Sequence, residues 1–150
     1  MSERVTNVVV AGLGGQGVLK ASDIIADAAF RVGADVKKSE IHGMSQRGGS
    51  VASDVRFGDR VESPMVPAGG ADFLVVVAED QVDVNLRHLA DGGTLITPER
   101  VDAGSLPNRR SLNVALLGIL SRHLDIDERY WHEAIRTNLP ERVHDANISA

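Results

Sequence analysis

The sequence predicts an α/β protein, a modified Rossmann-like three-layer sheet with helices on both faces. Three observations predict this fold. Residues 5–11 are a short apolar run that ends in glycines, residues 17–32 follow with helical spacing, and residues 73–78 repeat the apolar run ahead of a second helical segment. The 150 residues, with 43% hydrophobic and 25% charged side chains, match one globular domain spanning residues 1–150.

The first part of the chain is expected to form a strand, a glycine turn and a helix. Residues 5–11 are rich in valine and end at Gly12, as a buried parallel strand does before a turn. The apolar positions of residues 17–32 recur every three or four residues, which is typical of a helix packed on a core. Gly33 provides the stop for this helix.

The next part is expected to contain a short strand, a polar loop and a longer strand. Residues 35–39 can form the short strand, and residues 41–49, rich in glycine, serine and polar side chains, are expected to form a loop. Apolar and polar residues alternate through residues 51–57, which predicts a strand with one solvated face. A turn at residues 58–59 then directs the chain toward residues 60–62, as in a hairpin.

The second half is expected to alternate again between strands and helices. Residues 73–78 predict a buried strand, and residues 79–89 a helix with an acidic start that Gly92 and Gly93 end. Residues 94–97 predict another strand. Two more helices are expected, one with its apolar face within residues 112–124 and one that Asp127 caps and Pro140 closes.

The composition argues against several classes of function. There are 16 Lys and Arg against 21 Asp and Glu, with no basic tract, so nucleic-acid binding is not expected. The apolar runs are far shorter than the roughly 20 residues of a membrane helix, and no signal peptide is recognised, so a cytoplasmic location is expected. The chain has no cysteine, and its five histidines show no metal-binding spacing, so we expect neither an iron–sulfur cluster nor a bound metal.

A glycine turn follows the first predicted strand and matches the G-x-G-x-x-G pattern. Its candidate ligand-binding residues are Gly12, Gly14, Gly15, Gln16 and Gly17. Such a turn lets a phosphate or another chain approach the backbone, with the N–H groups of the helix start as donors. Tight packing without a ligand explains the pattern as well. A stand-alone NAD(P)- or nucleotide-binding regulatory domain is the alternative function, and it would need Glu40 as the ribose-binding acid.

A second motif occupies residues 39–51, with the sequence SEIHGMSQRGGSV, and its candidate cofactor-binding residues are His42, Gln46, Arg47 and Gly48. Together with the glycine turn, this stretch closely resembles the gamma-type subunit or domain of 2-oxoacid:ferredoxin oxidoreductases (the pyruvate/ketoisovalerate oxidoreductase family), closest to the beta subunits of indolepyruvate ferredoxin oxidoreductases. The resemblance extends through residues 55–58, 63–67, 71–72 and 113–118. Family members usually continue past residues 147–150, so the chain is expected to be short at its C-terminal end.

The resemblance implies a subunit that works only inside a larger complex. Enzymes of this family oxidatively decarboxylate a 2-oxoacid, such as indolepyruvate or another aryl pyruvate, to the acyl-CoA, and electrons pass to ferredoxin. Thiamine diphosphate, magnesium and iron–sulfur clusters are then expected on a large partner subunit, with coenzyme A at the shared interface. This chain would hold no cofactor, contribute no catalytic residue, be inactive alone and form a hetero-oligomer.

The sequence leaves open which 2-oxoacid is used, the subunit stoichiometry, and whether the two glycine-rich segments contact a ligand or only support the fold. Arg47 stands between Gln46 and two glycines, where a planar guanidinium could bind a carboxylate or a phosphate. A surface salt bridge is the other interpretation of Arg47. His42 is expected to be a structural histidine. An isolated subunit is also expected to self-associate or to expose an apolar face.

Overall fold

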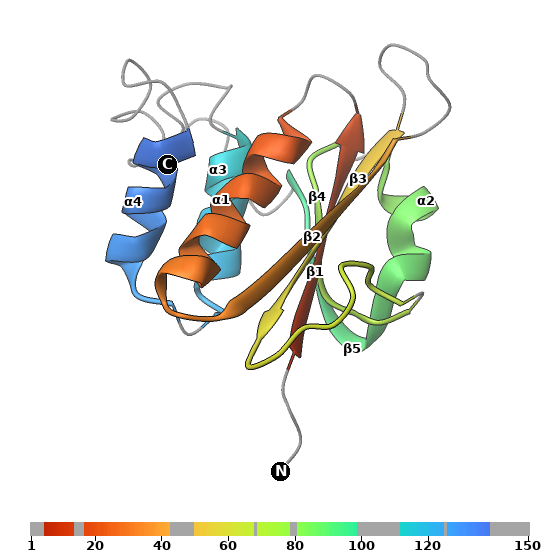
Figure 1. Cartoon of the computed structure of the whole chain (residues 1–150). Helices are drawn as coiled ribbons and strands as arrows, with labels where there is room; N and C mark the ends of the chain where they lie inside the picture. The colour runs from red at the N-terminus through yellow and green to blue at the C-terminus, as the bar shows by residue number, and fades with distance from the viewer. Residues whose placement is uncertain are drawn as a thin grey trace.

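The computed structural model describes residues 5–13, 17–42, 50–67, 69–78, 81–98, 112–124 and 126–138. Its strands form one five-stranded sheet in the order β2-β3-β1-β4-β5 (Figure 1). The strands are β1 (Val5–Leu13), β2 (Asp35–His42), β3 (Ser50–Gly58), β4 (Ala71–Val76) and β5 (Leu89–Ile96). The helices are α1 (Val18–Arg31), α2 (Val82–Asn85), the 3-10 helix η2 (Leu86–His88), α3 (Leu112–Ser121) and α4 (Glu128–Asn138).

The sheet is mixed rather than fully parallel. β1 lies at its centre, parallel to β4 and antiparallel to β3. β4 and β5 are parallel, while β2 and β3 form an antiparallel pair at the other side. Strand β3 is therefore inserted between β1 and β2, which would be neighbours in a simple doubly wound sheet. This insertion is the modification of the Rossmann-like pattern.

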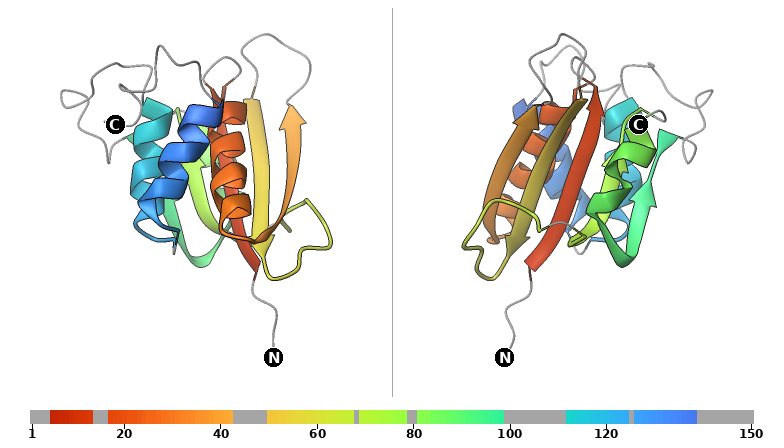
Figure 2. Two further views of the ribbon diagram at one scale, coloured as in Figure 1. Left: turned by 60° about the vertical axis from the view of Figure 1, so that its left-hand side comes forward. Right: turned by 90° about the vertical axis from the view of Figure 1, so that its right-hand side faces the viewer.

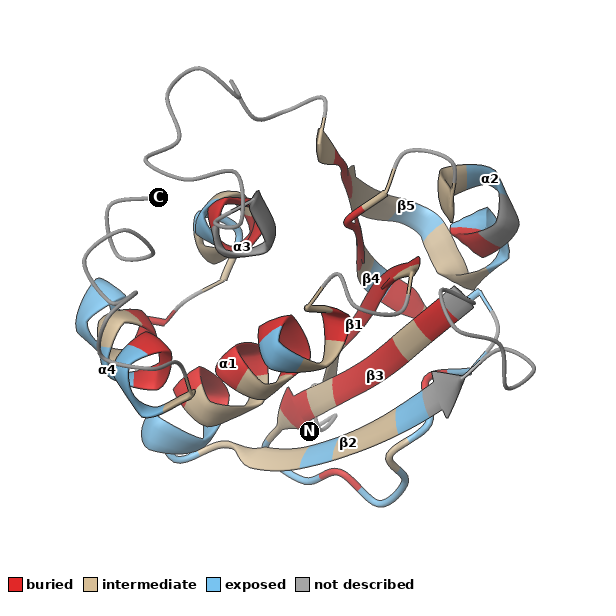
Figure 3. Ribbon diagram, turned by 90° about the horizontal axis from the view of Figure 1, so that it is seen from above, coloured by how far each residue is buried: buried red, intermediate tan, exposed pale blue. Residues whose placement is uncertain are grey.

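Helices cover both faces of the sheet, which confirms the predicted α/β class. α1, α3 and α4 lie on one face and α2 on the other (Figures 2 and 3). Alternate residues of the central strand point to opposite faces, so Val8 and Val10 join the core under α1, α3 and α4, whereas Val9 joins Leu74 on the face of α2. Apolar burial on both faces explains why β1 is apolar without a break.

The segment between β4 and β5 differs from its prediction. The expected helix over residues 79–89 is wrong in extent, because α2 has four residues and the 3-10 turn η2 ends at His88. β5 already begins at Leu89, so Gly92 and Gly93 lie inside a strand and do not end a helix. The ladder is irregular there, and a Cβ at Gly93 would lie 2.9 Å from the Ala71 carbonyl oxygen. The glycines permit this close approach of the two strands.

Two predictions around β3 are also corrected. β2 runs to His42, so residues 41–42 belong to a strand rather than to the loop, because β2 pairs with β3 along its whole length. The hairpin expected through residues 60–62 is wrong, since β3 already has β1 and β2 on its two sides. Residues 43–49 lie outside the described residues.

The ends of the first and last helices follow the sequence. Gly33 adopts a positive φ of 89°, and its N–H donates to the Phe30 carbonyl oxygen. The Asp127 carboxylate accepts the Arg129 N–H at 3.0 Å, as expected of an N-cap. Pro140, which was expected to close the last helix, lies outside the described residues.

Candidate functional site

The two glycine-rich segments predicted as binding elements leave the sheet at one edge. Leu13, the last residue of β1, pairs with Ser50, the first residue of β3. Gly12 and His42 both pair with Val51, one from each side. Two strand spacings separate Gly12 from His42, or about 10 Å. The end of β1, the end of β2 and the start of β3 thus share one edge, the carboxyl edge of the parallel strands, where ligands bind in open α/β sheets.

The described part of the glycine turn supports a tight entry into α1. Gly12 is buried in β1. Gly17 precedes the first helical residue with φ 80°, a left-handed conformation that strains residues with a side chain. The first turn of the 14-residue helix α1 carries no acidic side chain, so its positive end is not neutralised from within that turn. Gly14, Gly15 and Gln16 lie outside the described residues.

The residues of the second motif are placed only in part. His42 is the last residue of β2, and its backbone lies beside Val51. Gln46, Arg47 and Gly48 lie outside the described residues, so their roles stay predictions. The backbone nevertheless brings both ends of their loop to the edge that also bears the glycine turn.

Glu40 does not fit the role of a ribose-binding acid. Its carboxylate lies 3.3 Å from the Lys38 ammonium on its own strand. It is opposite Ser53 of β3, and β3 separates it from the glycine turn of β1. A dinucleotide site of the Rossmann type instead places this acid on the strand next to β1. The sheet therefore argues against the stand-alone NAD(P)-binding alternative.

A polar cluster that the sequence analysis missed lies away from the shared edge. Arg56 of β3 donates from Nε to Asn7 Oδ1 at 2.8 Å, and from Nη1 to the carbonyl oxygens of Ser63 and Met65 at 2.9 and 3.1 Å. The Asn7 N–H donates to the Asp72 carboxylate at 2.8 Å. We call this cluster the Arg56 clip. It connects three of the segments that carry the family resemblance, residues 55–58, 63–67 and 71–72, and so explains them as structural.

The clip holds residues 59–67, which we call the strap, against the sheet. A second anchor is Asp54, which is 3% exposed and accepts the Val66 N–H at 2.9 Å. Burial raises the pKa of the Asp54 carboxyl above its ordinary value, although the hydrogen bond from Val66 acts in the opposite direction. Burial also lowers the pKa of nearby His88, with a contribution from Arg87. The sequence offered one signal for this arrangement. Asp54 and Arg56 are both charged and lie on the same face of β3, the face that the alternating pattern predicted to be solvated.

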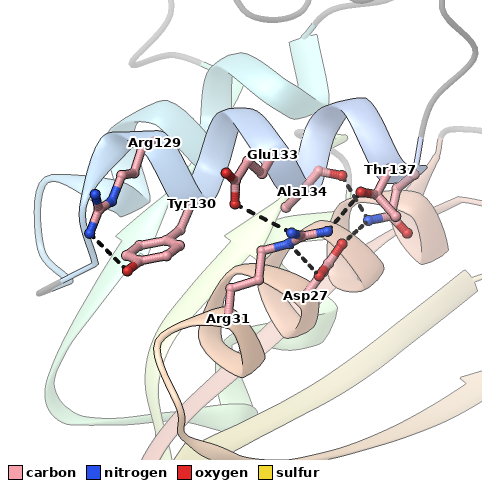
Figure 4. Close-up of polar contacts among 8 residues, drawn as sticks. Asp27, Arg31, Arg129, Tyr130, Glu133, Ala134 and Thr137 are labelled. Atoms are coloured by element: carbon pink, nitrogen blue, oxygen red, sulfur yellow. Dashed lines mark hydrogen bonds and ion pairs between the residues drawn. The ribbon is translucent and has the colours of Figure 1, made fainter.

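A different polar network joins α1 to α4 on the other side of the sheet (Figure 4). Arg31 donates to Asp27 at 2.9 Å within α1, and it reaches Glu133 at 3.3 Å and Thr137 Oγ1 at 2.8 Å on α4. Asn138 Nδ2 donates back to Asp27 at 2.9 Å. These contacts are mostly exposed and lie over buried apolar residues, so they orient the two helices and form no reactive site.

The described residues contain no group of three or more acidic or histidine side chains placed to hold a metal ion. The whole sequence lacks cysteine, so no thiolate of this chain can ligate an iron–sulfur cluster. None of the described helices has the length and apolar character needed to cross a membrane.

Known proteins resemble this chain in sequence and in fold. The family model described as "Pyruvate ferredoxin/flavodoxin oxidoreductase" matches residues 7–111. The indolepyruvate oxidoreductase subunit IorB of Thermococcus kodakarensis is 32% identical, over 96% of this chain and 91% of its own length. The keto/oxoacid ferredoxin oxidoreductase gamma subunit of Geobacter sulfurreducens has a TM-score of 0.76 and 21% identity, covering 96% of this chain and 90% of its own.

A larger enzyme contains the same fold. The 2-oxoglutarate:ferredoxin oxidoreductase of Magnetococcus marinus, solved with 2-oxoglutarate, coenzyme A and succinyl-CoA, has a TM-score of 0.82 at 20% identity over 98% of this chain. This chain spans 30% of that polypeptide. At such identities the solved structures establish the fold alone.

The inserted strand β3 distinguishes this sheet from the doubly wound sheet of a self-contained dinucleotide-binding domain, so the fold is a modified Rossmann-like domain. Within that class, the family match and the similarity to IorB identify the family. The chain belongs to the pyruvate ferredoxin/flavodoxin oxidoreductase family.

Proposed function

We propose that this chain is the cluster-free and thiamine-free subunit of a cytoplasmic 2-oxoacid:ferredoxin oxidoreductase complex that acts on indolepyruvate or another aryl pyruvate. The observation that carries the proposal is the similarity to an IorB subunit over 96% of this chain. The sharing of one sheet edge by the two glycine-rich segments supports it, since both motifs of the resemblance can then face the same neighbour.

The chemistry of the complex is assigned to the partner subunit. Thiamine diphosphate with magnesium would accept the electron pair left by decarboxylation there, and iron–sulfur clusters would pass it on singly to ferredoxin. This chain has no cysteine to hold a cluster. Its part in the reaction is to complete the partner's cleft and to bind anionic groups, including those of coenzyme A, at the shared interface.

The proposed contact residues are those of the two segments, with Arg47 as the principal one. A guanidinium flanked by glycines can approach a carboxylate or phosphate in a bidentate manner. Gly12 and Gly17 would let a ligand approach the backbone closely, and the N-terminus of α1 favours an anion. His42, Gln46 and Gly48, with Gly14, Gly15 and Gln16, would contribute polar or backbone contacts.

Reconstitution tests the assignment to a subunit. The chain is produced alone and together with the thiamine- and cluster-containing subunit from the same source. We expect the chain alone to be colourless and inactive, and the complex to reduce an iron–sulfur acceptor when indolepyruvate and coenzyme A are both present. Turnover by the chain alone, or failure to bind the large subunit, would contradict the proposal.

Steady-state kinetics of the assembled complex test the role of Arg47. Arg47→Ala removes a charge-assisted pair of on the order of 1.5–3 kcal/mol, which lowers kcat/KM roughly 10- to 150-fold. Arg47→Lys should recover only part of this loss. Oxoacid and coenzyme A are varied separately to show which substrate the residue serves. An unchanged kcat/KM for both, in a complex that assembles normally, would leave the segment with a structural role only.

A further inference from the structure

The outer edge of β2 is regular, and no other strand pairs with it in the described part of the structure. β2 pairs with β3 over its eight residues, and no described strand pairs with its other side. The strap passes nearby without a backbone hydrogen bond to β2, and its contact there is the Val61 N–H with the Asp35 side chain. The opposite edge, β5, is interrupted by the irregularity at its glycines. Such interruptions disfavour pairing of an edge strand with another chain, whereas a regular edge strand can pair in this way.

The charges on β2 favour antiparallel pairing with β2 of a second copy, and they favour one register of that pairing. A two-fold axis perpendicular to the sheet keeps equivalent faces on the same side. An axis at Lys38 sets two lysines opposite each other, and an axis at Glu40 sets two glutamates opposite each other. An axis at Ser39 sets Lys38 opposite the second copy's Glu40, and Glu40 opposite its Lys38. Opposite charges directly across an antiparallel pair are favourable and like charges are not. An axis at Val36 also sets opposite charges across from each other, Asp35 and Lys37, but it pairs only residues 35–37 of the strand, whereas the axis at Ser39 pairs residues 36–42. The Ser39 register is therefore the longest one with complementary charges.

An exposed aromatic ring lies on the flank of α1 above the same edge. Asp23 of α1 forms an ion pair with Lys38 of β2, which fixes the side of the helix that faces this edge. Phe30 follows Asp23 by seven residues and lies on the same side of the helix. Its side chain is 71% exposed, the largest exposure among the large apolar residues of the described chain. Two-fold pairing of β2 would place the second copy on the side of this flank and should lower the exposure of the ring.

We propose that the free edge of β2 is an interface between two copies of this chain, which pair as antiparallel strands about a two-fold axis at Ser39. The two sheets then continue across the axis, with both α1 helices on the same face. Each copy contributes the same surface, so the interface is closed and isologous. The proposal requires only the edge, its charges and Phe30, and it stands whether or not the proposed function is correct.

Sedimentation equilibrium of the purified chain tests the interface. We expect a monomer–dimer equilibrium in the wild-type chain. Glu40→Lys replaces two attractive pairs by two repulsive ones, so the dimer dissociation constant should rise roughly tenfold or more. Asp91→Lys makes the same charge change on the exposed part of the opposite edge strand and should leave dimerisation unchanged.

A second variant tests the interface without changing a charge. Phe30→Ser removes the exposed ring without disturbing the core, and it should also weaken the dimer. Circular dichroism establishes that each variant is folded. A chain that stays monomeric up to its solubility limit would overturn the proposal. So would a dimer that neither Glu40→Lys nor Phe30→Ser weakens, because the contact would then lie elsewhere.

Discussion

The helices on one face of the sheet and the strap on the other face are held in place by different kinds of contact. Under α1, α3 and α4 the contact is a continuous apolar core, including the fully buried Ile24 and Leu116, and the Arg31 network lies at its exposed rim. On the other face, Val66 of the strap joins a smaller apolar cluster, and polar contacts also hold the strap, a buried one from Asp54 and exposed ones from Arg56. Apolar packing is non-directional, whereas each polar contact fixes one donor and one acceptor.

This difference between the two faces shows which of the motifs shared with the family have a structural explanation. The helix side can accept other apolar residues of similar volume. The strap side depends on particular side chains, because the Arg56 guanidinium donates from two separate nitrogens, from Nε to Asn7 and from Nη1 to two strap carbonyls. Arg56 therefore belongs to the motifs for a structural reason. The functional role of residues 46–48 stays a prediction.

The largest expected effect is a cavity in the helix-side core. Leu116 of α3 is fully buried, and Leu116→Ala should lower the free energy of unfolding by about 2–5 kcal/mol, since lost burial and the cavity both contribute. Ile119→Ala, on the same helix but only partly buried, is the matched control and should cost much less. Urea unfolding followed by circular dichroism measures both variants. Equal losses would mean that α3 is not docked as described.

Removing the Arg56 clip should have the next largest effect. Arg56→Ala loses three hydrogen bonds from one charged group and should destabilise the chain by about 2 kcal/mol. Arg56→Lys should recover less than half, because an ammonium cannot reproduce the planar fork. The exposed pair of Arg60 and Glu62 provides the control, and Arg60→Ala should change stability little. Hydrogen exchange should show faster exchange of the Val66 amide in Arg56→Ala; an unchanged rate there would refute the clip.

The parts of the fold that follow local rules could be predicted from the sequence. The uninterrupted apolar run of β1, the spacing of α1 with its stop at Gly33, and the cap at Asp127 each depend on neighbouring residues. The insertion of β3 between β1 and β2 could not be predicted, because pairing of distant strands leaves no local signal. The same holds for the early start of β5, where pairing of Leu89 with Ala71 overrides a helical pattern.

The candidate site divides in the same way into local features that the sequence predicts and long-range contacts that it does not predict. The pattern and position of Gly12 and Gly17 indicated a turn into α1, and the structure confirms that β1 ends at Leu13 and that Gly17, with φ 80°, precedes the helix. The meeting of this turn with His42 through Val51 depends on strand order and needed the structure. The Arg56 clip was missed because an alternating strand with charged residues is normally interpreted as having one face in water.

A smaller effect, dependent on pH, is expected from Asp54. Its folded-state pKa is raised above the ordinary value of 3.8, so the folded chain holds the proton more tightly than the unfolded chain. This contribution to stability is fully present below pH 3.8 and is lost as the pH rises through the folded-state pKa. Asp54→Asn keeps an acceptor for Val66 but cannot ionise. Urea unfolding from pH 4 to pH 7 should therefore show the variant gaining stability relative to the wild type as the pH rises; a constant difference would contradict this.

The smallest effect is expected at the exposed rim of the helix side. Arg31 contacts Asp27, Glu133 and Thr137, but its side chain is 30% exposed and that of Glu133 is 48% exposed. Exposed ion pairs contribute little, since water competes for them and holding long side chains costs entropy. Arg31→Ala should therefore lower the free energy of unfolding by only about 0.5–1 kcal/mol.

Salt separates the charge of Arg31 from its packing. Most of the small loss in Arg31→Ala should disappear at 1 M salt, where the Debye length is about 3 Å. Arg31→Met, which keeps an apolar stem, should lose only the salt-dependent part. Measurements in chloride at two ionic strengths distinguish the cases. Arg129→Ala is the control, since this cation contacts Tyr130 of its own helix. A loss in Arg31→Ala as large as that of Arg56→Ala, and insensitive to salt, would mean that the network and not the apolar core holds α4 to α1, and the contrast between the two faces would fail.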